Sequence, residues 1–181
     1  MRKFFAVFVL IFIASSMAIV AQSSPLPGSN PNFKAKDFYA GAHLGLGGGW
    51  YSTIGPVVNV EYGVLSNLGV TASIGFFGYS ESFTGYTWSY TSIPVIVGAN
   101  YHFDLLRVNK LDTWVGLGLG YTFGGWSSSD AGRAYTGSVG SYFSWDGRLG
   151  GRYHFSDRIA GKLEFGYWSL GYARIGVDFK L

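Results

Sequence analysis

Apolar and polar residues alternate along most of the chain. Between residues 111 and 123 the odd positions hold Leu, Thr, Val, Leu, Leu, Tyr and Phe, whereas the even positions hold Asp, Trp, Gly, Gly, Gly and Thr. A period of two residues is typical of a β-strand whose two faces meet different surroundings. This stretch therefore predicts a strand with one face suited to oil and a second face of small or polar residues.

Runs of this kind follow one another along the chain, with turn residues between them. They cover residues 37–47, 57–65, 68–79, 92–103, 111–125, 142–155, 161–168 and 173–181. Several alternating runs separated by turn signals indicate an all-β sandwich or barrel. The question is then which of these two architectures the polar face favours.

The charged residues within the runs favour a membrane barrel over a soluble sheet. When the faces are assigned from the apolar residues, the charges that follow the first residue of a run fall on the opposite face, five of each sign: Glu61, Asp112, Asp146, Glu164 and Asp178, against Arg148, Arg152, Lys162, Arg174 and Lys180. Balanced charge among glycines indicates an enclosed interior, because a water-facing sheet would favour Lys, Glu and Thr. The apolar face then meets lipid, where a sheet must close to pair its edges.

We therefore predict an all-β fold, an eight-stranded antiparallel transmembrane up-and-down β-barrel over residues 37–181. Eight strands enclose a lumen just wide enough for side chains to fill it. A long loop split into two further strands would make ten, and the pattern leaves this alternative open.

The connections between the runs alternate in length, as expected of a membrane-spanning barrel. Residues 48–55, 80–91 and 124–138 form the long class and are predicted to be extracellular loops, whereas residues 66–67, 104–110 and 156–158 form the short, periplasmic class. The connection at residues 169–171 is a short exception on the outer side. Aromatic residues favour membrane interfaces, and five are expected near the outer rim: Trp50, Tyr51, Trp88, Tyr90 and Trp126.

The first residues have the pattern of an export signal. A basic start, an apolar stretch and small residues before Gln22 predict a secretory signal peptide over residues 1–21, with cleavage after Ala21 or, as an alternative, after Ala18. The following residues, 22–36, are rich in Pro, Ser and Asn and are predicted to be a mobile periplasmic linker.

Two strand ends carry a related motif. "VGANYHF" (97–103) and "LGGRYHF" (149–155) share Gly, Tyr, His and Phe at the same offsets. Together with the leader and "YAGAHLGLG", they resemble the small outer-membrane β-barrel proteins of Gram-negative bacteria, the porin-like OmpA/OmpX/OmpW group. The chain end "RIGVDFKL" resembles the signal read by the barrel assembly machinery, carried here by Arg174, Gly176, Phe179 and Leu181, although members of the group more often end in Phe. The resemblance implies a monomer in contact with outer-membrane lipid and lipopolysaccharide.

Composition adds few candidate sites. The chain has no cysteine, and its formal net charge of +3 is too small to indicate a nucleic-acid partner. His102 and His154 occupy equivalent strand ends, but two histidines without clustered Cys or carboxylate ligands are a weak metal signal. We expect no catalytic residues, no metal and no cofactor, and hence no enzyme.

The ten charges on the inner face allow two functions, and the outer loops allow a third. The charges form either a salt-bridged plug that holds the barrel together or a narrow pore for small solutes; the OmpW-like resemblance adds a conduit for small hydrophobic molecules. The outer loops, with aromatic residues such as Trp88, Trp126 and Tyr135, are candidates for binding a surface ligand. We favour the plugged barrel, serving envelope integrity or surface interaction.

Overall fold

The computed structural model describes residues 32–48, 53–104, 106–130 and 133–181. They form one antiparallel sheet whose strands are β1 (Phe38–Gly48), β2 (Thr53–Leu65), β3 (Leu68–Gly75), β4 (Phe77–Phe83), β5 (Tyr86–Phe103), β6 (Leu111–Asp130), β7 (Arg133–His154), β8 (Ile159–Trp168) and β9 (Ala173–Lys180). Within these residues there is no helix long and apolar enough to cross a membrane. The predicted signal peptide, and the linker up to residue 31, lie outside the described residues.

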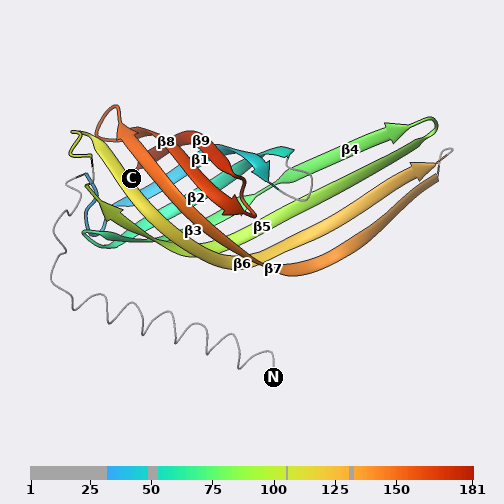
Figure 1. The fold of residues 1–181 in the computed structure, drawn as a ribbon, viewed down its shortest axis with the longest axis horizontal. Coiled ribbons are helices and arrows are strands. Elements are labelled where there is room, and N and C mark those ends of the chain that lie inside the picture. Colours follow the sequence, from blue (N-terminus) through green and yellow to red (C-terminus); the bar gives the residue numbers. More distant parts are fainter. Residues whose placement is uncertain (1–31, 49–52, 105, 131–132) are drawn as a thin grey trace, which may run out of the picture.

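The sheet closes on itself (Figure 1). Its strand order is β3-β2-β1-β9-β8-β7-β6-β5-β4, and an additional pairing of β3 with β5 joins the two ends. Every strand of the ring therefore has a hydrogen-bonded neighbour on both sides, which leaves no open edge in the barrel wall. The predicted all-β up-and-down barrel is confirmed.

The ring has eight strand positions, although the described residues form nine strands. β3 pairs with β5 over Val95–Tyr101, and β4 pairs with the same strand over Tyr86–Ser92, so β3 and β4 follow one another along one partner. Between them Phe76 donates its N–H to the carbonyl of Pro56 in β2 instead. The prediction of eight rather than ten strands around the barrel therefore holds.

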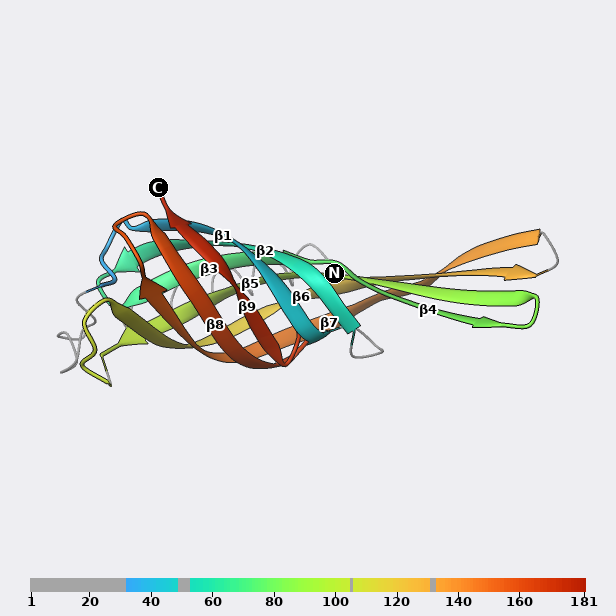
Figure 2. The ribbon, with the colours of Figure 1, turned by 90° about the horizontal axis from the view of Figure 1, so that it is seen from above.

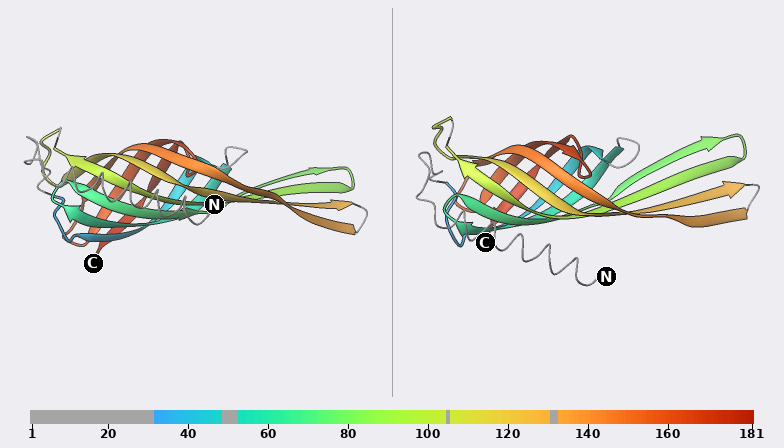
Figure 3. Two further views of the ribbon diagram at one scale, coloured as in Figure 1. Left: turned by 90° about the horizontal axis from the view of Figure 1, so that it is seen from below. Right: turned by 60° about the horizontal axis from the view of Figure 1, so that its bottom comes forward.

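The prediction of long loops at residues 80–91 and 124–138 is wrong. These residues continue the barrel strands as two hairpins, β4–β5 and β6–β7, which also pair with each other. We call this four-stranded part, residues 77–92, 124–130 and 133–140, the extension. It projects from one end of the barrel, and the C-terminus lies at the other end (Figures 1 and 2). β5, β6 and β7 run without interruption from the barrel wall into the extension (Figure 3), whereas β4 begins only after β3 has ended at Gly75.

The two faces of the barrel wall differ as the alternation predicts. Large apolar side chains such as Leu117, 69% exposed, point outward. Their neighbours in sequence point into the lumen and are buried, among them Asp112 and Trp114. The outer face thus presents a continuous apolar surface, which suits lipid and would be costly in water.

The glycines of the inner face make room for large side chains of neighbouring strands. A Cβ atom on Gly150 would lie 2.5 Å from the indole ring of Trp114, and one on Gly116 would lie 2.8 Å from Nε of Arg148. Both distances are too short for a real contact, so these two side chains occupy the space that the glycines leave. The lumen is therefore packed with side chains, as expected of an eight-stranded barrel.

Both ends of the lumen are capped by apolar side chains. At the end near the extension, Phe77 and Leu170 join Val57 and Ile96 in a buried apolar cluster. At the opposite end Phe33 is buried and stacks on the ring of His102, with 3.5 Å between ring centroids.

Phe33 lies in the stretch expected to be a mobile linker, and the structure differs from that expectation at residues 32–36. The amide of Asn32 donates to the carbonyl of Leu111 at 3.1 Å, and the N–H of Lys36 donates to the carbonyl of Gly63 at 2.7 Å. Hydrogen bonds to β6 and β2, together with the burial of Phe33, attach this segment to the barrel end.

Candidate functional site in the barrel lumen

Arg152 of β7 is the centre of a buried ion-pair cluster. Its three guanidinium nitrogens each meet a different carboxylate: Nη2 to Glu61 at 2.6 Å, Nε to Asp178 at 2.7 Å and Nη1 to Asp112 at 3.1 Å. The guanidinium also lies 3.8 Å from the centre of the Tyr39 ring, a cation–π contact. Each of the three guanidinium nitrogens thus has an anionic partner, which is a condition for a buried charge to be tolerated.

His102 of β5 joins two of the same carboxylates. Its Nδ1 lies 2.8 Å from Asp112 and its Nε2 lies 3.1 Å from Glu61. A neutral imidazole has one donor nitrogen, whereas carboxylates only accept, so this arrangement between two ionised carboxylates requires both ring nitrogens to be protonated. His102 in this form adds a positive charge to the lumen that the count of Lys and Arg leaves out.

A second cluster lies nearer the extension. Asp146 Oδ2 is 2.7 Å from Arg148 Nη1 and 3.2 Å from Arg174 Nη2. The remaining donors of Arg148 reach the side-chain oxygens of Asn100 at 2.8 Å and Thr71 at 2.6 Å. Arg148 therefore connects strands β7, β5 and β3 across the lumen.

Glu164 and Asn100 join the two clusters into one network. Glu164 Oε2 lies 3.2 Å from Arg174 Nε and 3.5 Å from Lys162 Nζ, and Lys162 reaches Asp178 of the first cluster at 3.9 Å. On another side, the Asn100 amide donates to Glu61 at 2.6 Å. Two separate paths of polar contacts thus run between the clusters.

Nine of the ten charges predicted for the lumen are buried in this network. They are Glu61, Asp112, Asp146, Arg148, Arg152, Lys162, Glu164, Arg174 and Asp178. Lys180 differs: its side chain is 29% exposed and pairs with Asp37 at 2.7 Å. Lys180 is the last residue of β9. The alternation correctly predicts that its side chain points inward, but at the end of the strand this side chain lies too far from the centre of the lumen to join the network.

The uncharged members of the network were not singled out from the sequence. Asn59 accepts from Lys162 Nζ at 3.1 Å, and the Trp114 indole donates to Glu164 at 3.2 Å. His43 contacts Asp178 at 2.8 Å. All three have inward parity, and this is the signal that could have found them.

The two histidines of the twin motifs, His102 and His154, have different surroundings. Both ring nitrogens of His102 face carboxylates, and within the described residues no three His, Cys, Asp or Glu side chains are arranged to hold a metal ion. The side chain of His154 lies edge-on to the Tyr39 ring, with 6.0 Å between ring centroids.

Three residues of the proposed assembly signal lie in β9, on both of its faces, and the fourth, Leu181, directly follows it. Arg174 and Gly176 face the lumen, where a Cβ on Gly176 would lie 2.4 Å from the His43 ring. Phe179 and Leu181 are exposed on the outside. β9 pairs with β1 and so joins the last strand of the barrel to the first.

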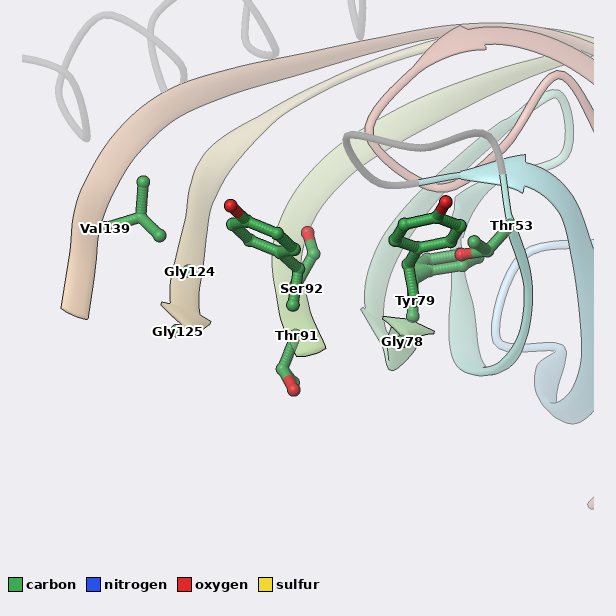
Figure 4. A pocket seen from close by; sticks show the side chains of 10 residues that line it. Thr53, Gly78, Tyr79, Thr91, Ser92, Gly124, Gly125 and Val139 are labelled. Carbon is green, nitrogen blue, oxygen red and sulfur yellow. The ribbon is translucent and has the colours of Figure 1, made fainter. Parts of the chain in front are cut away.

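The mouth of the barrel holds a small cavity of about 170 Å³, which the sequence did not indicate. Its wall includes Phe77, Tyr79, Tyr90, Ser92 and Gly124. Figure 4 shows Ser92 and Tyr79 on one side of the sheet, whereas Thr91 points to the other side. We call this cavity the mouth pocket.

The extension has two chemically different faces. Its inner face continues that of the lumen and carries aromatic residues: Tyr79, Phe83, Tyr86, Trp88, Tyr90, Trp126 and Tyr135. Its outer face carries hydroxyl residues: Ser80, Ser82, Thr87, Ser89, Thr91, Ser127, Ser129, Thr136 and Ser138. The apolar outer face of the barrel therefore ends where the extension begins. Trp88, Tyr90 and Trp126, expected at the membrane rim, lie on the inner face of the extension, and Trp50 and Tyr51 fall outside the described residues.

One half-buried tyrosine on the inner face of the extension, Tyr79, has a raised pKa. The hydroxyl of Tyr79 donates to Glu81 Oε2 at 3.1 Å. This hydrogen bond raises the pKa of Tyr79, because ionisation would remove the donated proton and place two negative charges together.

Comparisons with known proteins give a fold and no family. No protein-family model and no curated protein matches the chain. Among solved structures, a de novo designed transmembrane β-barrel is similar over 82% of this chain and 98% of its own, with 15% identity and a TM-score of 0.53.

Two natural structures are also similar. The N-terminal β-barrel domain of Pseudomonas aeruginosa OprF has 17% identity, with 81% of this chain and 98% of that chain covered and a TM-score of 0.49. Ail, the attachment invasion locus protein of Yersinia pestis, has 16% identity, 80% and 93% coverage and a TM-score of 0.44. At this identity the likeness to the designed barrel shows the fold of a transmembrane β-barrel but not a function. A function has to be inferred from the residues of this chain.

Proposed function

We propose that this protein is a non-enzymatic integral outer-membrane β-barrel with a closed lumen. Its role is envelope integrity or surface interaction, the latter through the extension. The observation that carries the proposal is the continuous ion-pair network across the lumen, capped by Phe33 at one end and by Phe77 and Leu170 at the other. A lumen filled in this way supports a structural wall rather than a solute path.

The outer surface supports insertion into a lipid bilayer. Exposed apolar side chains surround the barrel, and the outward positions change to Ser and Thr where the strands enter the extension. A spanning barrel needs such an apolar band between two polar regions. The extension then lies in water on one side, and the short turns and the C-terminus lie on the other.

The proposed export and assembly signals agree with this location. A signal peptide at residues 1–21 would deliver the chain across the inner membrane. The pattern of Arg174, Gly176, Phe179 and Leu181 on the closing strand would be read by the barrel assembly machinery. The apolar band supports contact with lipid and lipopolysaccharide as a monomer, because a closed single-chain barrel offers this surface to the membrane.

A narrow pore, or a conduit for small hydrophobic molecules, is the alternative function. It needs an open path through the lumen, or a side opening lined by apolar residues. Arg152 and its three carboxylates occupy the centre of one cluster, and Arg148 spans the lumen in the other. These contacts support the closed barrel over the pore.

Location and orientation can be tested with single cysteines, because the chain has none of its own. In cells expressing the protein, a membrane-impermeant maleimide should label Ser89→Cys in the extension before lysis. It should label Ser66→Cys, in the exposed β2–β3 turn, only after lysis. Labelling of Ser66→Cys but not Ser89→Cys in intact cells would reverse the orientation, and labelling of neither would contradict an outer-membrane location.

A further inference from the structure

We infer that the mouth pocket binds an uncharged sugar residue of a glycan, with Ser92 as its hydrogen-bonding group and Tyr79 and Tyr90 as its aromatic walls. This inference rests on the proposed function in that it places the extension outside the membrane, where glycans are found. It adds a ligand class to the surface interaction proposed above.

The pocket is built at the point where barrel and extension meet. Buried Phe77 forms part of its wall, and Gly124 leaves one side without a side chain. Its volume of about 170 Å³ suits a single small ring rather than a whole oligosaccharide. A bound residue would therefore be one unit of a chain that continues outward.

Ser92 provides the specific signal of a ligand. The residue is 5% exposed, and its hydroxyl has no hydrogen-bond partner among the described residues. A buried hydroxyl without a partner costs free energy, so such groups are rare unless a ligand or water satisfies them. In Figure 4 the side chain of Ser92 lies on the same side of the sheet as Tyr79, so a molecule in the pocket can meet both.

The aromatic residues continue from the pocket along the extension. The rings of Tyr90 and Trp88 are stacked, with 6.1 Å between their centroids, and Trp88 lies 5.4 Å from Trp126. A sugar ring has a face of C–H groups and a rim of hydroxyls. It therefore matches a site that combines aromatic surface with a few placed polar groups. A glycan extending out of the pocket would find further aromatic surface along its path.

The described residues that line the pocket carry no charge. They are Thr, Phe, Tyr, Ser, Gly and Val, so none of them pairs with a sulfate, phosphate or carboxylate. A purely apolar ligand would leave the Ser92 hydroxyl unsatisfied. The combination of neutral lining, aromatic walls and an unpaired hydroxyl thus favours a neutral sugar over both classes.

The test is a titration of the full-length protein refolded in dodecyldimethylamine oxide, because a sugar-headed detergent would compete for the pocket. The probes are maltohexaose and cellohexaose, with a heparin hexasaccharide as the anionic comparison and 1-decanol as the apolar one. The readouts are the calorimetric affinity and the amide NMR shifts of Gly78, Gly124 and Gly125, which line the pocket.

We expect saturable binding of at least one neutral hexamer at millimolar concentration or below. Ser92→Ala should weaken it about three- to tenfold, the effect of one neutral hydrogen bond, and Tyr90→Ala should weaken it about tenfold or more. Ser89→Ala is the matched control, because Ser89 lies on the same strand and faces the other side, toward Ser80. It should leave the affinity unchanged.

Three results would overturn the inference. These are the absence of saturable binding by either neutral hexamer, an affinity that Ser92→Ala and Tyr90→Ala leave unchanged, or competition by decanol or the heparin hexasaccharide for the same amide shifts. The titration in micelles is independent of membrane location and conductance. A negative titration would therefore leave the closed barrel standing, and a conducting barrel would leave the sugar site standing.

Discussion

Arg152 and Glu61 lie on opposite walls of the barrel, and yet their side chains meet at 2.6 Å. Arg152 belongs to β7 and Glu61 to β2, which are four strands apart in either direction around the ring. The pair therefore spans the full width of the lumen. Because both side chains are buried, little water screens the attraction, and neither charge has an alternative partner in solvent.

Replacing the central cation should destabilise the barrel strongly. Arg152→Met leaves Glu61, Asp112 and Asp178 without their shared partner, and stranding buried charges costs about 3–5 kcal/mol. Urea unfolding in detergent, followed by tryptophan fluorescence, measures this loss. The control is Arg158→Met in the exposed β7–β8 turn, which should change stability little. Equal stability of Arg152→Met and the wild type would show that the ion pairs do not hold the lumen together.

The twin motifs predict unequal roles for their two histidines. His102→Gln replaces two donor nitrogens, one toward each carboxylate, by one amide nitrogen and one acceptor oxygen, so either Glu61 or Asp112 then faces an oxygen. We expect a loss of about 2 kcal/mol. His154→Gln is the matched control, because that histidine is only partly buried and lacks the two carboxylate contacts. A larger loss for His154→Gln in the same unfolding experiment would contradict the assignment of His102 as a cation of the network.

Glycines on the inner face should not tolerate a larger residue where a neighbouring side chain fills the space beside them. A Cβ atom on Gly150 would lie 2.5 Å from the Trp114 ring, so Gly150→Ala should displace the indole from Glu164 and cost about 1–3 kcal/mol. Adding Trp114→Leu should reduce the penalty of Gly150→Ala, which a double-mutant cycle of unfolding free energies measures. Gly147→Ala is the control on the same strand, since its Cβ would meet only ordinary contacts from 3.4 Å upward. Additive effects of the two changes would contradict steric coupling.

The cap that Phe33 forms at the barrel end opposite the extension should contribute to the free energy of unfolding. Phe33→Ala removes a buried ring stacked on His102 and should cost about 3 kcal/mol. Phe155→Ala is the control, because Phe155 is exposed on the outer face. If the two substitutions gave equal unfolding midpoints, the segment before β1 would not be part of the folded barrel.

The alternation of residues predicts faces well because it depends only on the geometry of a strand. It places Glu61, Arg148 and Asp178 inside and Leu117 outside without any knowledge of neighbours. It predicts neither how deep in the lumen a side chain lies nor which residues of neighbouring strands pair with each other. Arg152 and Glu61 are 91 residues apart, and their contact depends on how the four strand pairings on each side of the ring align. Lys180 shows the limit, since it has inward parity but reaches the rim and pairs with Asp37.

The extension was missed because its alternation lacks an apolar outer face. Thr87, Ser89 and Thr91 alternate with Tyr86, Trp88 and Tyr90, which is the period of a strand. Clusters of Ser, Thr and Gly usually indicate loops, and this composition outweighed the period. Phe33 was missed for a different reason. A single aromatic residue in a Pro- and Asn-rich stretch has no period, and its partner His102 comes 69 residues later.

A conductance measurement shows whether the lumen is closed. The refolded protein is inserted into a planar lipid bilayer, and a heat-shifted gel band confirms that the inserted material is folded. The network of Arg152 and Arg148 and the caps of Phe33 and Phe77 predict a silent bilayer under applied voltage. Discrete and stable channel openings would contradict the closed barrel and would assign the buried charges to the wall of a water-filled pore.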